Sequence, residues 1–215
     1  MATLPRMLTL FGSQGSGSAA VEIALQRCSL PFKVLRASTW EADSAQEALR
    51  CVNPLAQIPA LQLEDGSVLT ESAAILIHLG LCHPAAGLLP AEPGARAQAL
   101  RGLVFIAANC YAAIGVIDYP ERWLPDSEGT QRESLRLGAR ARLHSYWEIF
   151  ADQFSGEPYL SGVEPGALDF LAAVVSRWSG SRAHLRQARP ALLATLERVE
   201  AHPAAAPVLS QHWPA

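Results

Sequence analysis

One stretch of the chain, residues 53–76, constrains the fold more than any other. It reads as a loop ending at Pro59, a short strand, a turn at Asp65-Gly66, a second strand, and a helix opened by Glu71-Ser72. A strand tolerates proline at its first residue, and the peptide bond before Pro59 is a candidate for the cis isomer. Asp-Gly between two apolar runs predicts a hairpin. The stretch therefore predicts an unpaired backbone edge beside a helix N-terminus, which suits a peptide-sized ligand.

The residues before this stretch predict alternating strands and helices. Leu8 to Gly12 reads as a strand, and apolar residues at helical spacing from Ala20 to Leu25 follow it. Phe32 to Leu35 reads as a second strand, which we expect to run parallel to the first because a helix separates them. Ser44 to Val52 predicts a short helix whose capping box pairs Ser44 with Glu47.

No strand pattern follows residue 83. The proline- and glycine-rich segment 84–93 reads as a linker. Residues 95–118 are strongly apolar and predict a central helix buried on most of its surface. Further helices are expected over 131–154, 166–178 and 190–202.

Composition and charge exclude several classes of function. The chain has 215 residues, half of them hydrophobic, which is enough for a substantial core. A net charge of −3 and a single lysine, Lys33, give no basis for a nucleic-acid partner. No apolar run is predicted to span a membrane and the N-terminus resembles no secretory signal, so a cytoplasmic protein without a membrane partner is expected.

The cysteines show neither a disulfide framework nor the spacing of zinc ligands, so we expect them to be reduced and buried, and expect no metal. They are Cys28, Cys51, Cys82 and Cys110.

The central motif resembles a known family. Asn-Pro-x-x-x-Ile-Pro from Asn53, followed by Asp65-Gly66 and Glu71-Ser72-x-x-Ile, is similar to the glutathione-binding half of the thioredoxin-like domain of glutathione S-transferases. The resemblance implies α/β plus all-α architecture. Residues 1–83 would form a thioredoxin-like domain with a mixed four-stranded sheet, and 94–215 an all-helical domain. It also implies glutathione as cosubstrate, a small-molecule electrophile, and a two-fold homodimer.

The resemblance assigns a glutathione-binding role to five residues. Glu71 would hold the ammonium of the γ-glutamyl end, and Ser72 its carboxylate, which a helix N-terminus attracts. The backbone of Ile58, before Pro59, would pair with the cysteinyl part as an added strand does. Gln57 would reach the glycyl end, with a solvated loop position as the alternative. For Glu71-Ser72 the alternative is an ordinary helix cap.

Thiol activation is assigned to the loop before the first helix. A free thiol has a pKa of about 8.5, and lowering it by about two units requires roughly 2.7 kcal/mol of preferential thiolate stabilisation. One hydroxyl donor beside a helix N-terminus is of that size. The candidates are Ser16 first, then Ser18 and Ser13, with helix capping alone as the alternative. Gly17 aligns with the cysteine of cysteine-type members, which disfavours a cysteine mechanism.

The helical half is expected to supply the second-substrate pocket. Asn109 and Tyr111 on the central helix, with Tyr119 and Trp123 after it, are candidates to stack an aromatic electrophile, or are core residues instead. The family usually opens a buried helix with Ser or Thr and places Asp three residues later. This chain has Gly166 and Asp169, which suggests a divergent subgroup.

These patterns lead to one principal prediction and its alternatives. The principal prediction is a glutathione transferase that activates the thiol for attack on a small apolar or aromatic electrophile. A glutathione-dependent isomerase or disulfide reductase could use the same site. A non-catalytic binding or ligand-carrier module is the alternative from a different class.

Overall fold

The first half of the chain forms a mixed sheet with helices on both faces. The computed structural model describes residues 7–214. In chain order the elements of this half are β1 (Leu8–Gly12), α1 (Ser18–Arg27), β2 (Phe32–Arg36), α2 (Gln46–Val52), β3 (Ala60–Gln62), β4 (Val68–Thr70) and α3 (Ser72–Cys82).

The sheet has the order β2-β1-β3-β4, with β1 and β2 parallel and the other two pairs antiparallel. The predicted parallel pairing is confirmed, with Leu10 opposite Val34, and Leu10 also faces Leu61 across the antiparallel pair. The predicted hairpin joins β3 to β4. The peptide bond between Ile58 and Pro59 is cis.

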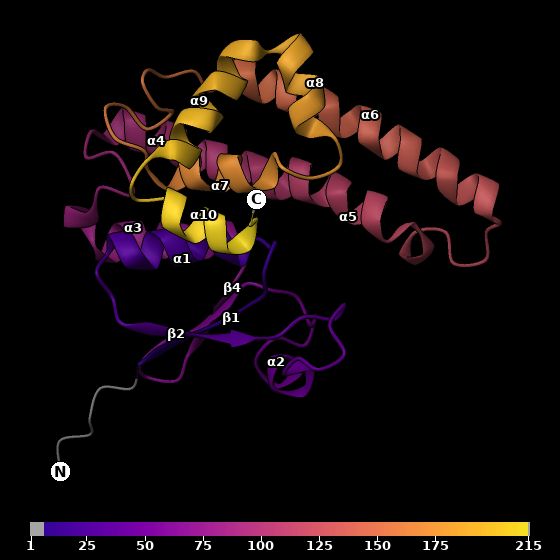
Figure 1. Ribbon diagram of the computed structural model, residues 1–215, viewed down its shortest axis with the longest axis horizontal. Coiled ribbons are helices and arrows are strands. Elements are labelled where there is room, and N and C mark those ends of the chain that lie inside the picture. Colours follow the sequence, from indigo (N-terminus) through magenta and orange to yellow (C-terminus); the bar gives the residue numbers. More distant parts are fainter. Residues whose placement is uncertain (1–6, 215) are drawn as a thin grey trace.

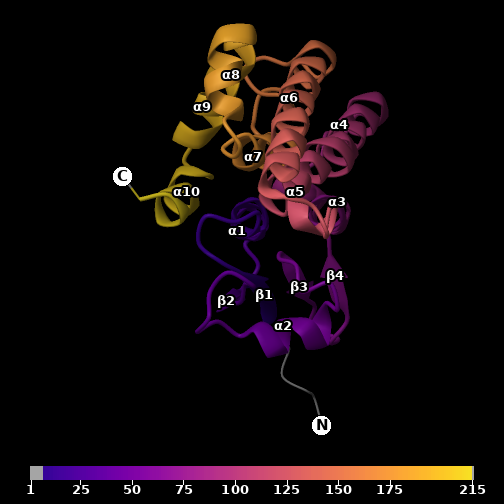
Figure 2. The same cartoon turned by 90° about the vertical axis from the view of Figure 1, so that its right-hand side faces the viewer.

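Helices cover this sheet unequally. Figure 2 shows α2 on the side of the sheet away from the helical half, whereas α1 and α3 lie between the sheet and that half. All five residues of β1 are buried, because β1 is central and packed on both faces. A small hydrophobic cluster that includes Phe11 of β1 and Leu49 of α2 packs α2 against the sheet.

The second half is entirely helical among the residues described, apart from one isolated bridge between Tyr159 and Gly162. Its elements are η1 (Pro84–Ala86), α4 (Pro93–Phe105), η2 (Ile106–Tyr111), α5 (Ala112–Asp118), η3 (Pro120–Arg122), α6 (Gly129–Gln153), α7 (Ala167–Val175), α8 (Ser181–Ala188), α9 (Pro190–Ala201) and α10 (Ala206–His212). Every residue of α7 is buried, and α6 with α5 extends as an arm to the right of Figure 1.

The two halves share one hydrophobic core. Helix α1 packs against α7 and α10, and α3 packs against α7 and α4. Figure 1 shows α10, at the C-terminal end of the chain, lying beside α1 near the start of the chain. This contact fixes the C-terminal helix against the domain that carries the predicted glutathione motif.

Helix α7 begins without a side-chain cap, and Asp169 ties the preceding loop to its first turn. Its carboxylate accepts hydrogen bonds from the backbone N–H groups of Leu160 (2.7 Å), Ser161 (3.0 Å) and Gly166 (3.0 Å). A Cβ on Gly166 would lie 2.7 Å from both the Leu88 carbonyl oxygen and the Ser161 hydroxyl. A side chain at residue 166 would therefore clash with these two oxygen atoms, which explains the glycine. The sequence alone did not indicate this.

Two local predictions were wrong. Helix α2 begins at Gln46 rather than Ser44, and no Ser44–Glu47 capping box forms. The Ser44 hydroxyl instead donates to the Ser38 carbonyl (2.8 Å) and accepts from the Ser38 N–H (3.0 Å). These bonds to the preceding loop occupy the hydroxyl, so it does not cap the helix. Cys51 and Cys82 are exposed rather than buried.

The central segment also differs from the prediction. Residues 93–118 form a continuous helical run that is long and apolar enough, by length and composition only, to cross a membrane, a test that a core helix also passes. An 18-residue window within it is only 39% buried, although it packs against α6 and α7. One side of this run lines a cavity, which explains why it is less buried than predicted.

Candidate functional site

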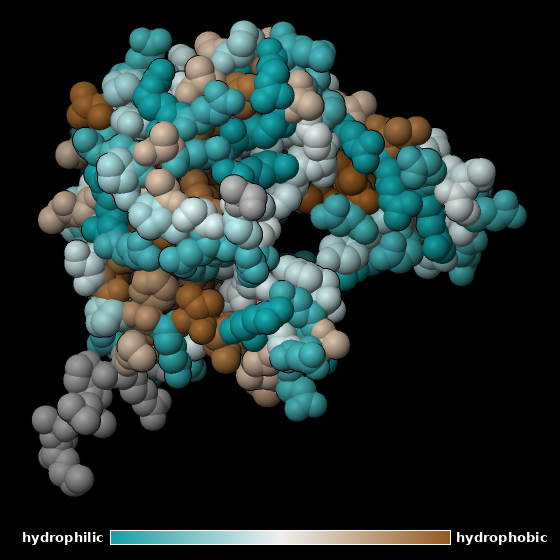
Figure 3. Space-filling model, in the orientation of Figure 1, coloured by the Kyte–Doolittle hydropathy of each residue, from teal (hydrophilic) through white to brown (hydrophobic). Residues whose placement is uncertain are grey.

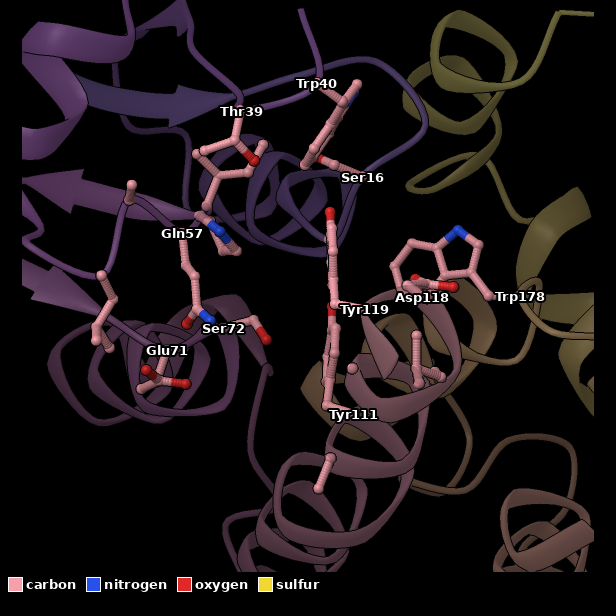
Figure 4. A pocket seen from close by; sticks show the side chains of 18 of the residues that line it. Ser16, Thr39, Trp40, Gln57, Glu71, Ser72, Tyr111, Asp118, Tyr119 and Trp178 are labelled. Carbon is pink, nitrogen blue, oxygen red and sulfur yellow. The ribbon is translucent and has the colours of Figure 1, made fainter. Parts of the chain in front are cut away.

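A cavity of about 740 Å³ lies between the two halves of the chain. Figure 3 shows the surface hollowed between the sheet domain and the α5–α6 arm, and Figure 4 shows side chains from both halves lining the cavity. The first half contributes the starts of α1 and α3 and the loop before β3. The second half contributes the segment from residue 107 to residue 123, and Trp178. This volume is within the range of small-molecule sites.

The loop before β3 presents unused backbone groups to the cavity. The Asn53 side chain holds the loop, because its amide donates to the Gln57 carbonyl (2.8 Å) while its oxygen accepts from the Leu55 N–H (3.2 Å). Within residues 7–214, no protein hydrogen bond uses the backbone N–H or C=O of Ile58. Gln57, Ile58 and Pro59 all line the cavity, so an extended ligand could pair with this edge.

Glu71 and Ser72 lie at the N-terminus of α3 and also line the cavity. Glu71 has φ 64°, in the left-handed region that non-glycine residues rarely occupy, and such strain concentrates at functional sites. No side chain caps α3, so its first N–H groups are not satisfied in that way. Ser72 is buried, whereas the Glu71 carboxylate is exposed. The Glu71 carboxylate can bind a positive charge, and the N-terminus of α3 beside it can bind a negative charge. Together they suit a zwitterionic group.

Of the three candidate serines only Ser16 lines the cavity. Its hydroxyl lies 2.7 Å from the Ser13 carbonyl oxygen, to which it donates, and accepts from the Ser18 N–H at 3.2 Å. All three serines are buried, and Ser13 and Ser18 do not line the cavity. The Ser18 hydroxyl donates to Glu22 at 3.0 Å. Both Ser16 and Ser18 are therefore engaged in holding the loop.

The C-terminal helix anchors this loop. His212 is 2.9 Å from Glu22 through Nε2 and accepts from the Gly15 N–H through Nδ1 at 3.2 Å. Because Nδ1 accepts, Nε2 carries the proton and donates to the Glu22 carboxylate. The Gln14 amide donates to the Gln211 carbonyl at 3.0 Å. Sequence patterns gave no sign of this network, since its members are far apart in the chain.

The second-substrate predictions divide between the cavity and its surroundings. Tyr111, Tyr119 and Trp123 line the cavity. Asn109 does not line it, and its amide donates to the Phe105 carbonyl on its own helix at 3.0 Å. The Arg122 guanidinium lies 3.9 Å from the centre of the Tyr119 ring and brings a positive charge to the cavity wall.

Sequence reasoning missed several lining residues. Trp178 packs against Tyr111 with ring centres 5.8 Å apart, and Trp40 with Thr39 lines the side near α1. The available signal was that Trp40 follows a predicted strand and Trp178 ends a predicted helix, and aromatic side chains at such positions often contact ligands. Among residues 7–214 no cluster of three His, Cys, Asp or Glu side chains could hold a metal ion.

Comparisons with known proteins agree with this arrangement. Residues 18–80 match the model of the glutathione S-transferase N-terminal domain. The chain is 31% identical to the GST-like protein YncG of Escherichia coli (strain K12), over 80% of its own length and 82% of that protein. The chain belongs to the glutathione S-transferase family.

The resemblance to other glutathione S-transferases extends over nearly the whole chain. The structure of a glutathione transferase homologue from Sulfitobacter with bound glutathione has a TM-score of 0.83 and 25% identity, covering 94% of this chain and 96% of that one. The maleylacetoacetate isomerase of Pseudomonas aeruginosa is 26% identical over 94% of this chain and 97% of that protein. The predicted fold class, a thioredoxin-like domain followed by helices, is confirmed. The findings support a glutathione transferase or a related glutathione-dependent enzyme.

Proposed function

We propose that the chain is a glutathione transferase that joins the glutathione sulfur to a small apolar or aromatic electrophile. One observation carries this proposal. A single cavity joins the free backbone edge at Ile58, the N-termini of α1 and α3, and a group of aromatic side chains. Glutathione matches the first three features, and an aromatic electrophile matches the last.

In the proposed complex glutathione lies extended across the sheet domain. Ile58 pairs with the cysteinyl backbone, Pro59 packs beside it, and Gln57 contacts the glycyl end. Glu71 holds the γ-glutamyl ammonium, and Ser72 with the α3 N–H groups holds its carboxylate. Extended pairing would direct the sulfur toward the start of α1.

The proposed reaction is a nucleophilic displacement. Ser16 and the backbone N–H groups at the start of α1 stabilise the thiolate, and the thiol proton passes to solvent. The sulfur then attacks an electrophilic carbon beside Tyr119 and Trp123. A carbon–sulfur bond forms, and the leaving group departs with the electron pair of the bond that breaks.

Titration calorimetry with reduced glutathione tests the binding site. We expect saturable binding by the wild type in the micromolar to millimolar range. Replacing both Glu71 and Ser72 with alanine removes two hydrogen bonds to charged groups and should weaken binding about 100-fold or more. Glu64→Ala, an exposed acid at the β3–β4 turn, is the matched control and should bind normally. If the wild type fails to bind, the alternative of a non-catalytic module is favoured.

Glutathione-dependent isomerisation is a second candidate, supported by the maleylacetoacetate isomerase relative and by Arg122 in the cavity, which suits an acidic substrate. There the sulfur would add to a conjugated carbon–carbon double bond, rotation would follow, and the sulfur would leave again. Conjugation consumes one glutathione per product, whereas isomerisation consumes none. Measuring free thiol during turnover with a halonitroaromatic electrophile and with a cis-unsaturated diacid distinguishes them.

We also propose that the enzyme is a cytoplasmic two-fold homodimer, as the family resemblance implies. Light scattering of the purified protein tests the oligomeric state. A monomer at micromolar concentration would contradict this part of the proposal.

A further inference from the structure

One hydroxyl at the cavity has no hydrogen-bond partner. The Tyr111 hydroxyl oxygen is closed off from solvent and makes no hydrogen bond within the part of the chain that the structure describes. Ser72 lies close to it without forming a bond of standard geometry. A buried donor without an acceptor is unfavourable and rare, so an acceptor supplied by a ligand would satisfy it.

This hydroxyl occupies the place where a side chain on residue 17 would begin. A Cβ on Gly17 would lie 2.2 Å from the Tyr111 oxygen, 3.4 Å from its Cζ and 3.7 Å from Cδ of Pro59. Gly17 has φ −63° and ψ −12°, which any residue adopts. Its backbone conformation therefore does not require glycine, whereas the position of the Tyr111 hydroxyl does.

A second unused donor lies at the same point. The backbone N–H of Gly17 precedes α1 and has no protein acceptor among residues 7–214. Gly17, Pro59, Ser72 and Tyr111 all line the cavity. Two donors, one from each half of the chain, therefore meet at the wall of the cavity beside Pro59, next to the Ile58 edge.

We propose that the Tyr111 hydroxyl donates a hydrogen bond to the sulfur of bound glutathione, and that Gly17 is glycine to admit it. This inference rests on the proposed function and adds a thiol contact from the helical half. Ser16 is less free to serve, because its hydroxyl already donates to Ser13. Burial raises the pKa of Tyr111, so the hydroxyl keeps its proton at neutral pH and acts as a donor rather than a base.

The first test is Tyr111→Phe, which keeps the ring against Trp178 and removes only the hydroxyl. The thiolate of bound glutathione is measured by its ultraviolet absorbance across a pH titration, and glutathione affinity by calorimetry. We expect about tenfold less thiolate at neutral pH, from the loss of one hydrogen bond to a charged sulfur, with affinity changed by less than about threefold. Tyr146→Phe, on α6 away from the cavity, is the matched control and should leave both unchanged.

The second test is a double-variant cycle with Gly17→Ala. Alone, the new methyl group should displace the hydroxyl and lower the thiolate fraction about as much as Tyr111→Phe does. In the Tyr111→Phe background it should add little, because the nearest remaining atoms would be at 3.4 Å or more. Equal losses from Gly17→Ala in both backgrounds would overturn the link between the two residues.

The outcomes separate this inference from the function beneath it. Normal glutathione binding with an unchanged thiolate fraction in Tyr111→Phe would overturn the inference and leave the transferase standing, with Ser16→Ala as the next variant. Absence of glutathione binding by the wild type would overturn the proposed function and this inference together. Reduced thiolate with near-normal affinity supports both.

Discussion

The contacts of His212 predict that the C-terminal helix α10 stabilises α1 and the loop before it, through Glu22 and Gly15. Both residues are nearly buried, at 7% and 8% exposure. Replacing His212 with alanine removes the donor to Glu22 and the acceptor for the Gly15 N–H. Each buried polar group left without a partner costs about 1–3 kcal/mol. Since water can enter the space that the imidazole leaves, we expect the free energy of unfolding to fall by about 2–4 kcal/mol.

A milder variant separates the contact from general packing. Glu22→Gln keeps an oxygen that can still accept from the Ser18 hydroxyl and from His212, so it should cost only about 1 kcal/mol. Ser210→Ala, exposed on the same helix, removes only a local bond to Pro207 and serves as control. Urea denaturation followed by circular dichroism measures all three. A change of less than about 0.5 kcal/mol for His212→Ala would refute the reasoning.

Three further predictions concern other parts of the fold. Pairing with Arg36 lowers the pKa of Glu41 from 4.5 to about 2, so its contribution to stability is present above pH 4.5 and lost as pH falls toward 2; thermal melts of Glu41→Gln and wild type should differ at neutral pH and converge in acid. Burial raises the pKa of Cys110 to about 12, so Cys51 should react with a thiol reagent in the native protein and Cys110 only after denaturation. Gly166→Ser, which restores the usual family residue, should destabilise the protein by about 1–3 kcal/mol in chemical denaturation, because its Cβ has no room; equal or greater stability would contradict this.

The sheet domain was predictable because its signals are local. The Asp65-Gly66 turn and the run before Pro59 are complete within a few residues, and short connections leave few topologies open. The observed bounds of β1, Leu8–Gly12, match the sequence prediction. Helix α10 was missed for the opposite reason. It has seven residues in an alanine- and proline-rich segment, and its stability depends on packing against α1, far away in the chain.

The candidate site shows the same division. The residues predicted from the central motif, Gln57 to Pro59 and Glu71-Ser72, all line the cavity, because one short segment brings them there. The residues from the helical half could not be ranked from sequence. Whether a residue of the central helix faces the cavity depends on packing, and of the two candidates on this helix Tyr111 lines the cavity and Asn109 does not.

Two glycines stand where this chain departs from the usual pattern of its family, and each lies against a hydroxyl from another segment. At Gly166 the usual cap hydroxyl is absent, and the Ser161 hydroxyl lies 2.7 Å from where its Cβ would be. At Gly17, the position aligned with a cysteine in other members, the Tyr111 hydroxyl lies 2.2 Å from the corresponding point. In both places a small residue leaves space that a hydroxyl from elsewhere fills. The two places differ in what the hydroxyl does. The Tyr111 residue lines the cavity, whereas the Ser161 hydroxyl has no hydrogen-bond partner among the described residues, and the contacts at the start of α7 are made by the Asp169 carboxylate. A side chain restored at Gly17 should therefore displace the Tyr111 hydroxyl, and a variant that also lacks this hydroxyl should tolerate the side chain better. At Gly166 the Leu88 carbonyl oxygen lies 2.7 Å from the same point, so removing the Ser161 hydroxyl should not make room for a side chain.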